Sequence, residues 1–465
     1  MRDKNVFGKI ADSGPKSQSN GPGRLMYALV LPKVFPQPEE LAAMSHALSD
    51  HSESYLSELR LFIEDICCDL CLFDDALQGD ACSGGIRVDR EFHLGAPSTF
   101  ADIRIAPAGA APYFIEVKVG YSDAALVRHL ARKYSIDTPQ VNEADKVVLV
   151  VDAEDRPRWN EVEAALRAQF NPRLQLEVFD ESSLQAAVLE RLGVNVGAIT
   201  EQQLLDVRDR IESALGFQAF GGESIDSYRN DPLRAELLWH LGASRLCELR
   251  ARGRKTAREI LPPKLYRGVA VLMADLSSFS SFVRDTPDPD VIRESLTNFY
   301  TKSRYKIVNG GGMLYQFVGD AVIGFFGVPE ASASPIDDCL DAARALLDIG
   351  HSVSDHWQRQ IDRVQPMGGA HIGLTIGDVE VLSLRPFSRT RIGAVSDSIN
   401  MAARLLSAAD AGQIVVSNSF YHKLDMDRQR DFVELKPLDA RNVGRIKAWK
   451  LDLSERYADA GSAGK

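Results

Sequence analysis

Two apolar runs that each lead to an aspartate constrain this sequence more than any other feature. The run VAVLMADL brings the chain to Asp275, and GGGMLYQFVGDAVIGFFG places Asp320 after a glycine between two apolar stretches. Each run is typical of a buried strand, and a Gly-Asp step between two such runs predicts a hairpin. An aspartate at a strand end also serves as a turn or cap residue. Two aspartates at neighbouring strand ends can instead hold a pair of divalent ions, so the interpretation depends on the segments that follow.

A helix further along the chain carries polar residues that would suit such a pair. The segment RIGAVSDSINMAARLLSAADAGQIVVS predicts a helix in which Asn400 and Arg404 are four residues apart and therefore lie on one face. An asparagine and an arginine that project together suit a ribose and a developing phosphate charge. The same two residues could also belong to a solvated helix face.

Five ordered segments resemble the catalytic domain of the class III adenylate and guanylate cyclases. They are LPPKLYRG, VAVLMADLSSFS, GGGMLYQFVGD, INMAARL and VELKPL, and the resemblance runs from Leu261 to Leu453. It implies an α+β domain with a ferredoxin-like sheet and helices on one face. The activity it implies is conversion of a nucleoside triphosphate to a 3′,5′-cyclic nucleotide and pyrophosphate.

The resemblance also assigns roles to residues. Asp275 and Asp320 would bind two Mg²⁺ or Mn²⁺ ions, and the main-chain carbonyl of Leu276 would complete the ligand set and lie against the nucleotide. Asn400 would orient the ribose. Arg404 would stabilise the negative charge that develops on the α-phosphate. The family builds each site from two chains, so a chain with both halves should form a symmetric homodimer with two sites at the interface.

Several positions depart from the family pattern. Gln316 stands where adenylate cyclases have a base-reading lysine, and Gly393 stands at the second base-reading position. Gln316 can both donate and accept hydrogen bonds, whereas Gly393 offers no side chain. Lys436 matches the family's triphosphate-binding lysine, although Pro437 follows it where glycine is usual. His371 lies where a phosphate-contacting arginine is common.

Intact catalytic residues with altered base readers resemble the pyrimidine cyclases of bacterial Pycsar antiphage systems. That resemblance implies a uridylate or cytidylate cyclase that makes cyclic UMP or cyclic CMP, which then acts on a separate effector protein. Two alternatives stay open. The first is an adenylate or guanylate cyclase with a divergent base pocket, and the second is an inactive cyclase-like nucleotide sensor joined to an N-terminal nuclease.

The N-terminal half contains a second group of chemically suited residues. STFADIRIAPAGAAPYFIEVKV predicts a hairpin that brings Asp102, Glu116 and Lys118 together near one end of a sheet. The following helix, strand, helix and strand complete an order that resembles the PD-(D/E)xK nuclease-like fold of restriction endonucleases. In active members the carboxylates hold Mg²⁺ and the lysine helps activate water. Because many domains of this shape are not nucleases, we expect a sensor or regulatory module instead.

Composition and length complete the predicted organisation. The 465 residues suit two or three domains, and a net charge of −11 argues against nucleic acid as a partner. No apolar stretch approaches the roughly 20 residues of a membrane helix, and the cysteines show no disulfide framework, so we expect a cytoplasmic protein with no membrane contact. The predicted parts are a flexible tail (1–23), a restriction-endonuclease-like α/β domain (24–193), a helical linker (194–260), the cyclase domain (261–453) and a second tail (454–465).

Overall fold

The computed structural model describes thirteen stretches of the chain, which belong to one unit, Asp50–Lys465. They are residues 53–78, 86–96, 99–119, 123–151, 164, 166–168, 170–196, 204–219, 232–254, 256–358, 368–384, 391–440 and 444–457. The predicted N-terminal tail, residues 1–23, lies outside them. Within these stretches, no helix combines the length and the apolar character that crossing a bilayer requires.

A mixed five-stranded sheet forms the N-terminal part, in the order β1-β2-β3-β4-β5. The β1–β2 and β2–β3 pairs are antiparallel, and the β3–β4 and β4–β5 pairs are parallel. Adjacent residues of β3 face opposite sides, since Phe114 packs with Leu130 of α4 and Ile115 packs with Phe62 of α3. The elements are α3 (Glu53–Gln78), β1 (Arg87–His93), β2 (Phe100–Ala106), β3 (Tyr113–Val117), α4 (Asp123–Lys133), η2 (Pro139–Glu143), β4 (Lys146–Val151) and β5 (Gln175–Asp180).

The predicted hairpin, helix and later strands of this part are found where the sequence places them. The assignment to a nuclease-like fold stays a prediction, as do the boundaries of the domains.

Helices connect this sheet to the C-terminal one. The elements are α6 (Glu181–Leu192), α7 (Leu204–Ala219), α9 (Pro232–Ala251) and α10 (Ala257–Ile260). The sequence predicts one continuous helix in the region of α9, but its backbone breaks at Gly242, where φ is 74° and ψ is 161°. Glycine is needed there, because a Cβ would also lie 2.8 Å from a methyl carbon of Val308.

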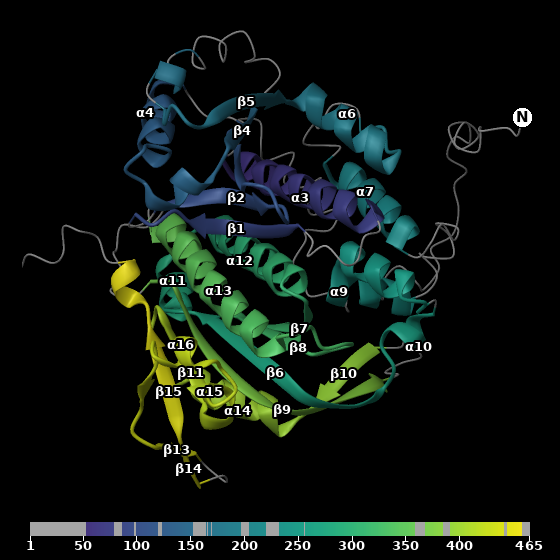
Figure 1. The fold of residues 1–465 in the computed structure, drawn as a ribbon, viewed down its shortest axis with the longest axis vertical. Coiled ribbons are helices and arrows are strands. Elements are labelled where there is room, and N and C mark those ends of the chain that lie inside the picture. The colour runs from purple at the N-terminus through teal and green to yellow at the C-terminus, as the bar shows by residue number, and fades with distance from the viewer. Residues whose placement is uncertain are drawn as a thin grey trace, which may run out of the picture. The chain divides into compact units, whose positions relative to one another are not determined.

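The C-terminal sheet is largely antiparallel, in the order β12-β15-β11-β9-β6-β8-β7, with β10 also paired to β9. Its strands other than β12 are labelled in Figure 1. Its elements are β6 (Lys264–Leu276), α11 (Phe279–Asp285), α12 (Pro289–Asn309), β7 (Gly312–Val318), β8 (Ala321–Phe326), α13 (Pro335–Gln358), β9 (Ala370–Leu384), β10 (Arg391–Val395), α14 (Asp397–Leu406), β11 (Gln413–Ser417), α15 (Asn418–Tyr421), α16 (Met426–Gln429), β12 (Val433–Glu434) and β15 (Ala448–Asp452). A separate small ribbon joins β13 (Leu438–Ala440) and β14 (Gly444–Ile446).

Helices cover both faces of this sheet, which corrects the prediction of helices on one face. A Cβ at Gly350 of α13 would lie 2.4 Å from Ala370 of β9, and a Cβ at Gly373 of β9 would lie 2.3 Å from the carbonyl oxygen of Ala402 in α14. Positions 370 and 373 of one strand face opposite sides, so α13 and α14 lie on opposite faces. α9 joins α14, because Leu237 and Ala402 belong to the same apolar core. The prediction, taken from the family resemblance, did not account for α14 and the linker helix α9, which pack on the face opposite α13.

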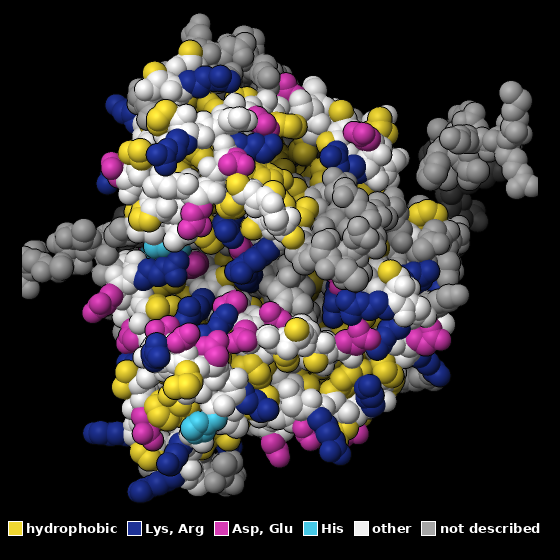
Figure 2. Space-filling model, in the orientation of Figure 1, with side chains coloured by type: hydrophobic (Ala, Val, Ile, Leu, Met, Phe, Trp, Pro, Cys, Tyr) yellow, Lys and Arg dark blue, Asp and Glu magenta, His cyan; other side chains and the backbone are white. Residues whose placement is uncertain are grey.

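Buried ion pairs join the two sheets through α12. Lys302 and Lys306 are one helical turn apart, and their ammonium groups pair with Glu91 and Asp89 of β1. All four side chains are at most 10% exposed. On the face shown in Figure 2, the remaining acidic and basic side chains are interspersed.

The last described residues pack onto α13. Residues 454–456, at the start of the predicted C-terminal tail, form the short helix η5 (Ser454–Arg456). The hydroxyl of buried Tyr457 donates to Asp348 at 2.7 Å. Residues 458–465 lie outside the described stretches.

Candidate active site

The two predicted metal-binding aspartates lie side by side. Asp275 is the penultimate residue of β6 and pairs across the sheet with Ala321, which directly follows Asp320 in the turn between β7 and β8. Burial, then the charge of Asp320, raises the pKa of Asp275 to about 7. The Oδ1 atom of Asp275 is buried and has no hydrogen-bond partner. Two adjacent carboxylates with an unused buried oxygen form a site that attracts a cation.

The chemistry of this pair fits Mg²⁺ or Mn²⁺. Mg²⁺ is held in proteins by one or two carboxylates together with water and substrate phosphates. Among the described residues, no group of three or more His, Cys, Asp or Glu side chains is arranged to hold a metal. Asp275 and Asp320 could supply the two carboxylates of such a site, with phosphate oxygens as further ligands. Leu276 is 2% exposed, and its backbone N–H bonds to the Asp275 carboxyl. The role predicted for its carbonyl stays a prediction.

His371 is the aromatic neighbour of the aspartates. It pairs with Asp275 across β6 and β9, with its Nε2 atom 3.8 Å from Oδ2 of that residue, and its Nδ1 atom lies 3.0 Å from the hydroxyl of Ser277. Burial lowers the pKa of His371, although Asp320 opposes this. The ring is therefore neutral at neutral pH, so its contact with Asp275 is not a charge pair.

Asn400 and Arg404 project from the outer face of α14. Its inner face is marked by Ser398 and Ala402, which lie against the glycines of β9, and by Leu405, which is fully buried. Asn400 and Arg404 are each two residues from Ala402, which is about 200° around a helix. Both side chains thus point away from their own sheet, and Asn400 is exposed. In the described part of the chain, neither residue makes a side-chain hydrogen bond or an ion pair.

The two predicted base-reading positions differ in environment. Gln316 is exposed, and it lies opposite Ile323 on the sheet face of Asp275 because the register shifts between Leu314 and Gln316. Gly393 is buried in β10, where a Cβ would lie 2.5 Å from a methyl carbon of Leu384. The space beside Gly393 is therefore filled by Leu384.

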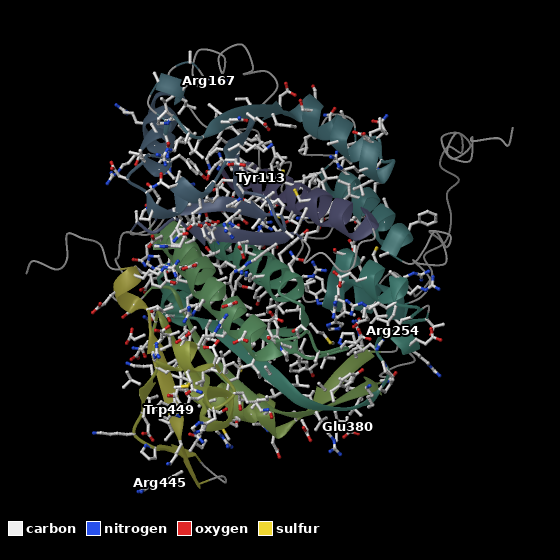
Figure 3. The ribbon with its side chains drawn as sticks, viewed as in Figure 1. Tyr113, Arg167, Arg254, Glu380, Arg445 and Trp449 are labelled. Carbon is white, nitrogen blue, oxygen red and sulfur yellow. The ribbon has the colours of Figure 1, made fainter. Side chains whose placement is uncertain are left out.

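Lys436 is exposed in the segment that follows β12. In the adjoining strand, Glu434 pairs with Trp449 of β15. Trp449 is labelled in Figure 3. The ring of Trp449 stacks on Tyr421 with 3.7 Å between centroids. Lys436 thus follows a paired strand, and within the described stretches its side chain makes no hydrogen bond or ion pair.

Asp102, Glu116 and Lys118 of the N-terminal sheet lie together as the sequence predicts. Lysine side chains pair with both carboxylates. Lys118 Nζ lies 2.7 Å from both Asp102 and Glu116. Lys133 of α4 lies 2.6 Å from Glu116 and 3.9 Å from Asp102, and Tyr134 also donates to Glu116. Burial opposes ionisation of Asp102, but Lys118 and Lys133 outweigh it and lower the pKa of that carboxyl. Two ammonium groups therefore balance the charges of the two carboxylates.

This cluster borders a cavity of about 160 Å³ between the N-terminal sheet and α12 and α13. Asp102 and Lys118 line one side, and Glu294, Lys302 and His356 line the other. Polar side chains of the N-terminal sheet and of helices α12 and α13 thus line one pocket.

The catalytic domain can be assigned from a family comparison. Residues 261–452 match the family model described as the adenylate and guanylate cyclase catalytic domain. This region is a cyclase domain. The chain is 28% identical over 166 residues to an uncharacterized protein of Mycobacterium tuberculosis, a match that covers 34% of this chain and 27% of that protein. A second uncharacterized protein of that organism is 28% identical over 153 residues, which cover 32% of this chain and 26% of that protein. The chain therefore spans about a quarter of the length of the curated relatives it matches.

Solved cyclase structures are also similar to this chain. The adenylyl cyclase CyaB from P. aeruginosa has 18% identity and a TM-score of 0.36, and the similarity covers 40% of this chain and 95% of that one. The guanylyl cyclase Cya2 has 22% identity and a TM-score of 0.36, with 41% of this chain and 95% of that one covered.

The sequence does not predict two side chains of these sites. Tyr300 of α12 donates a hydrogen bond to the carbonyl of Gly319, next to Asp320, from 19 residues away. Lys133 reaches Glu116 from α4. Both contacts depend on how a helix packs on its sheet. In the sequence, each of these residues is marked only as a polar side chain on a helix next to a motif.

Proposed function

We propose that the cyclase domain converts a nucleoside triphosphate into a 3′,5′-cyclic nucleotide and pyrophosphate, with UTP or CTP as the preferred substrate. The observation that carries this proposal is the adjacent pair Asp275 and Asp320 with its unpartnered buried oxygen. The match of residues 261–452 to the cyclase catalytic domain supports the same reaction.

The reaction forms one bond and breaks one. The ribose 3′-oxygen attacks the α-phosphorus, the bond from that phosphorus to the bridging oxygen breaks, pyrophosphate leaves, and the 3′-hydroxyl proton passes to solvent. Divalent ions bound by Asp275 and Asp320 would supply positive charge beside the attacking and leaving oxygens. Asn400 would hold the ribose in the reactive orientation, and Arg404 would stabilise the charge growing on the α-phosphate. Lys436 would bind the triphosphate.

We further propose that each site forms between two copies of the chain. Asn400 and Arg404 face away from the sheet that carries their own Asp275, so they suit an aspartate pair on another copy. Two identical chains that exchange these residues would make a symmetric dimer with two sites.

The base preference is inferred from Gln316. Its amide can both donate and accept, so it can meet the N3–H and O4 of uracil or, when flipped, the N3 and N4 of cytosine. The space beside Gly393 is filled by Leu384, which favours a small base. An adenylate or guanylate cyclase with a divergent pocket is the second candidate.

The deciding experiment is incubation of the purified chain with Mn²⁺ and each of ATP, GTP, UTP and CTP, followed by mass analysis. We expect cyclic UMP or cyclic CMP. Product from ATP or GTP alone would refute the pyrimidine preference. Absence of any cyclic product, together with metal-dependent DNA cleavage that Lys118→Ala abolishes, would favour a nucleotide sensor with an N-terminal nuclease.

Mixing two inactive variants tests the shared site. Asp320→Ala and Arg404→Ala should each be inactive alone, because each spoils both sites of its own dimer. A mixed dimer combines one intact Asp320 with one intact Arg404, so random exchange should restore about a quarter of wild-type turnover. Turnover that stays at the level of the separate variants would place both residues in a site within one chain.

The proposed cyclic nucleotide would act in the cytoplasm on a separate effector protein as an antiphage messenger. The N-terminal part is proposed as its sensor or regulatory module. The internal pairing of Asp102 and Glu116 with two lysines supports this role over metal-dependent cleavage.

A further inference from the structure

Three aromatic rings connect the linker helix α9 to the turn that carries Asp320. The indole of Trp239 in α9 meets Phe317 of β7 edge to face, with 6.0 Å between centroids. Phe317 in turn stacks on Tyr300 of α12 at 4.1 Å and 15°. The Tyr300 hydroxyl then donates to the backbone carbonyl of Gly319. A continuous series of contacts thus leads from α9 to the residue that precedes Asp320.

Hydrogen bonds hold α9 in place around Trp239, where this series begins. Arg304 of α12 donates to the carbonyls of Leu238 and Trp239 at 2.8 and 2.9 Å, just before α9 breaks. The Nδ1 atom of buried His240 lies 2.5 Å from the carbonyl oxygen of Leu314 in β7. Burial lowers the pKa of His240 to about 4, so its neutral ring donates this hydrogen bond at neutral pH. α9 is therefore bonded to α12, which carries Tyr300, and to β7, which leads into the Asp320 turn.

The series ends at the two-residue turn between β7 and β8, which the ladder pair Val318 and Ala321 closes. Gly319 has a φ of 63° and is exposed, as is Val318 before it. In the part of the chain that the structure describes, the Tyr300 hydroxyl makes the one side-chain hydrogen bond to the backbone of residues 318–321. This side-chain contact adds to the backbone pairing of Val318 with Ala321, and it acts on the carbonyl directly before Asp320.

We propose that Tyr300 is a positioning residue for Asp320, and that the seating of α9 through Trp239 sets how well the aspartate pair holds its ions. This deepens the proposed cyclase function and rests on it for the reaction. It also gives the linker a role, because Ser244 of α9 donates to the carbonyl of Leu72 in α3 at 3.3 Å. A shift of α3 in the N-terminal part would then reach Asp320 through α9.

The test compares Tyr300→Phe with the matched control Tyr266→Phe in the full chain. Tyr300→Phe keeps the stacked ring and removes only the hydroxyl, so the fold should persist. Tyr266 likewise donates its hydroxyl to a backbone carbonyl, that of Pro262 at 2.9 Å, but at the opposite end of β6 from Asp275. Mn²⁺ affinity is measured by calorimetry without nucleotide, and backbone hydrogen exchange is followed in β7 and β8.

Tyr300→Phe should weaken Mn²⁺ binding by about 10-fold, as is typical when a group that orients a metal ligand is lost. Exchange should speed up in residues 319–322, and turnover should recover at saturating Mn²⁺. Tyr266→Phe should match the wild type in Mn²⁺ affinity, hydrogen exchange and turnover. Mn²⁺ affinity within twofold of the wild type for Tyr300→Phe, or an equal loss for Tyr266→Phe, would overturn the proposal.

Trp239→Ala tests the link to α9. It should weaken Mn²⁺ binding in the same direction, and the Trp239→Ala/Tyr300→Phe double variant should be no weaker than the poorer single one, because both act on one turn. Additive losses would overturn the link. The Mn²⁺ measurement, with Asp320→Ala as its null, stands even if no triphosphate yields a cyclic product. Absence of any cyclic product would refute the proposed function but not the role of Tyr300 in Mn²⁺ binding.

Discussion

Asp320→Ala should abolish cyclic-nucleotide formation while leaving the fold intact. Metal-ion assistance contributes several kcal/mol to such transition states and 1.36 kcal/mol is tenfold in rate, so we expect a loss of at least about 100-fold. Stability should hold or rise, because the charge of Asp320 contributes to raising the pKa of Asp275. Removing one of two like charges relieves their repulsion.

The measurement pairs product formation with thermal unfolding. Asp427→Ala is the matched control, since Asp427 is an aspartate of the same domain with an 86% exposed side chain. The control should keep full turnover. If Asp320→Ala retained a tenth of wild-type turnover, or if it melted well below the control, the aspartate pair would not be the metal site we propose.

The local features of this site are predictable from sequence because each follows from strand or helix geometry. An apolar run that ends at Asp275 gives a buried strand, and the Gly-Asp step before Ala321 gives the hairpin, so the two acids meet as soon as β6 and β8 pair. The spacing of Asn400 and Arg404 fixes a shared face of α14 in the same way.

The features that the sequence does not predict all depend on contacts between distant segments. The register shift before Gln316 decides which face that residue joins, and no nearby residue marks it. The packing of Gly393 on Leu384 follows from how β10 lies on β9. The sequence predicts α9 as part of a helical linker, yet its leucines complete the core of the cyclase sheet. Amphipathic patterns show that a face is buried but not what covers it.

The charged interface between the two sheets also depends on contacts between distant segments that the sequence does not predict. A substitution at this interface, Lys302→Met, should cause the largest loss of stability. Lys302 reaches across to Glu91 and lies 3.6 Å from Glu64, and both acids are about 10% exposed. Burial alone would lower the pKa of Lys302, but Glu64 and then Glu91 outweigh it and raise that pKa. The lysine is therefore fully charged at neutral pH and compensates buried acids.

The neighbouring ion pair, Asp89 with Lys306, makes the stability of the interface depend on pH in the acid range. Burial opposes ionisation of Asp89, but Lys306 and then Arg87 outweigh it and hold its pKa at about 2, below the ordinary 3.8. An acid whose pKa is lowered by folding stabilises the fold above its unfolded pKa and loses that contribution as the pH falls through its folded value. The Asp89 contribution should therefore disappear between pH 3.8 and about 2.

Lys302→Met should destabilise the protein by about 3–5 kcal/mol, because it keeps the length of the side chain but leaves buried carboxylates without their cation. Urea unfolding followed by tryptophan fluorescence measures this. Lys146→Met is the matched control, since Lys146 forms a 3.0 Å pair with Glu177 in which the side chains are 32% and 39% exposed. An exposed pair contributes at most about 1 kcal/mol, so the control should stay close to the wild type. Equal losses of stability for the two substitutions would mean that water reaches the interface. The pairing of Lys302 with Glu91 and Glu64 would then not be a buried ion pair that joins the N-terminal sheet to α12.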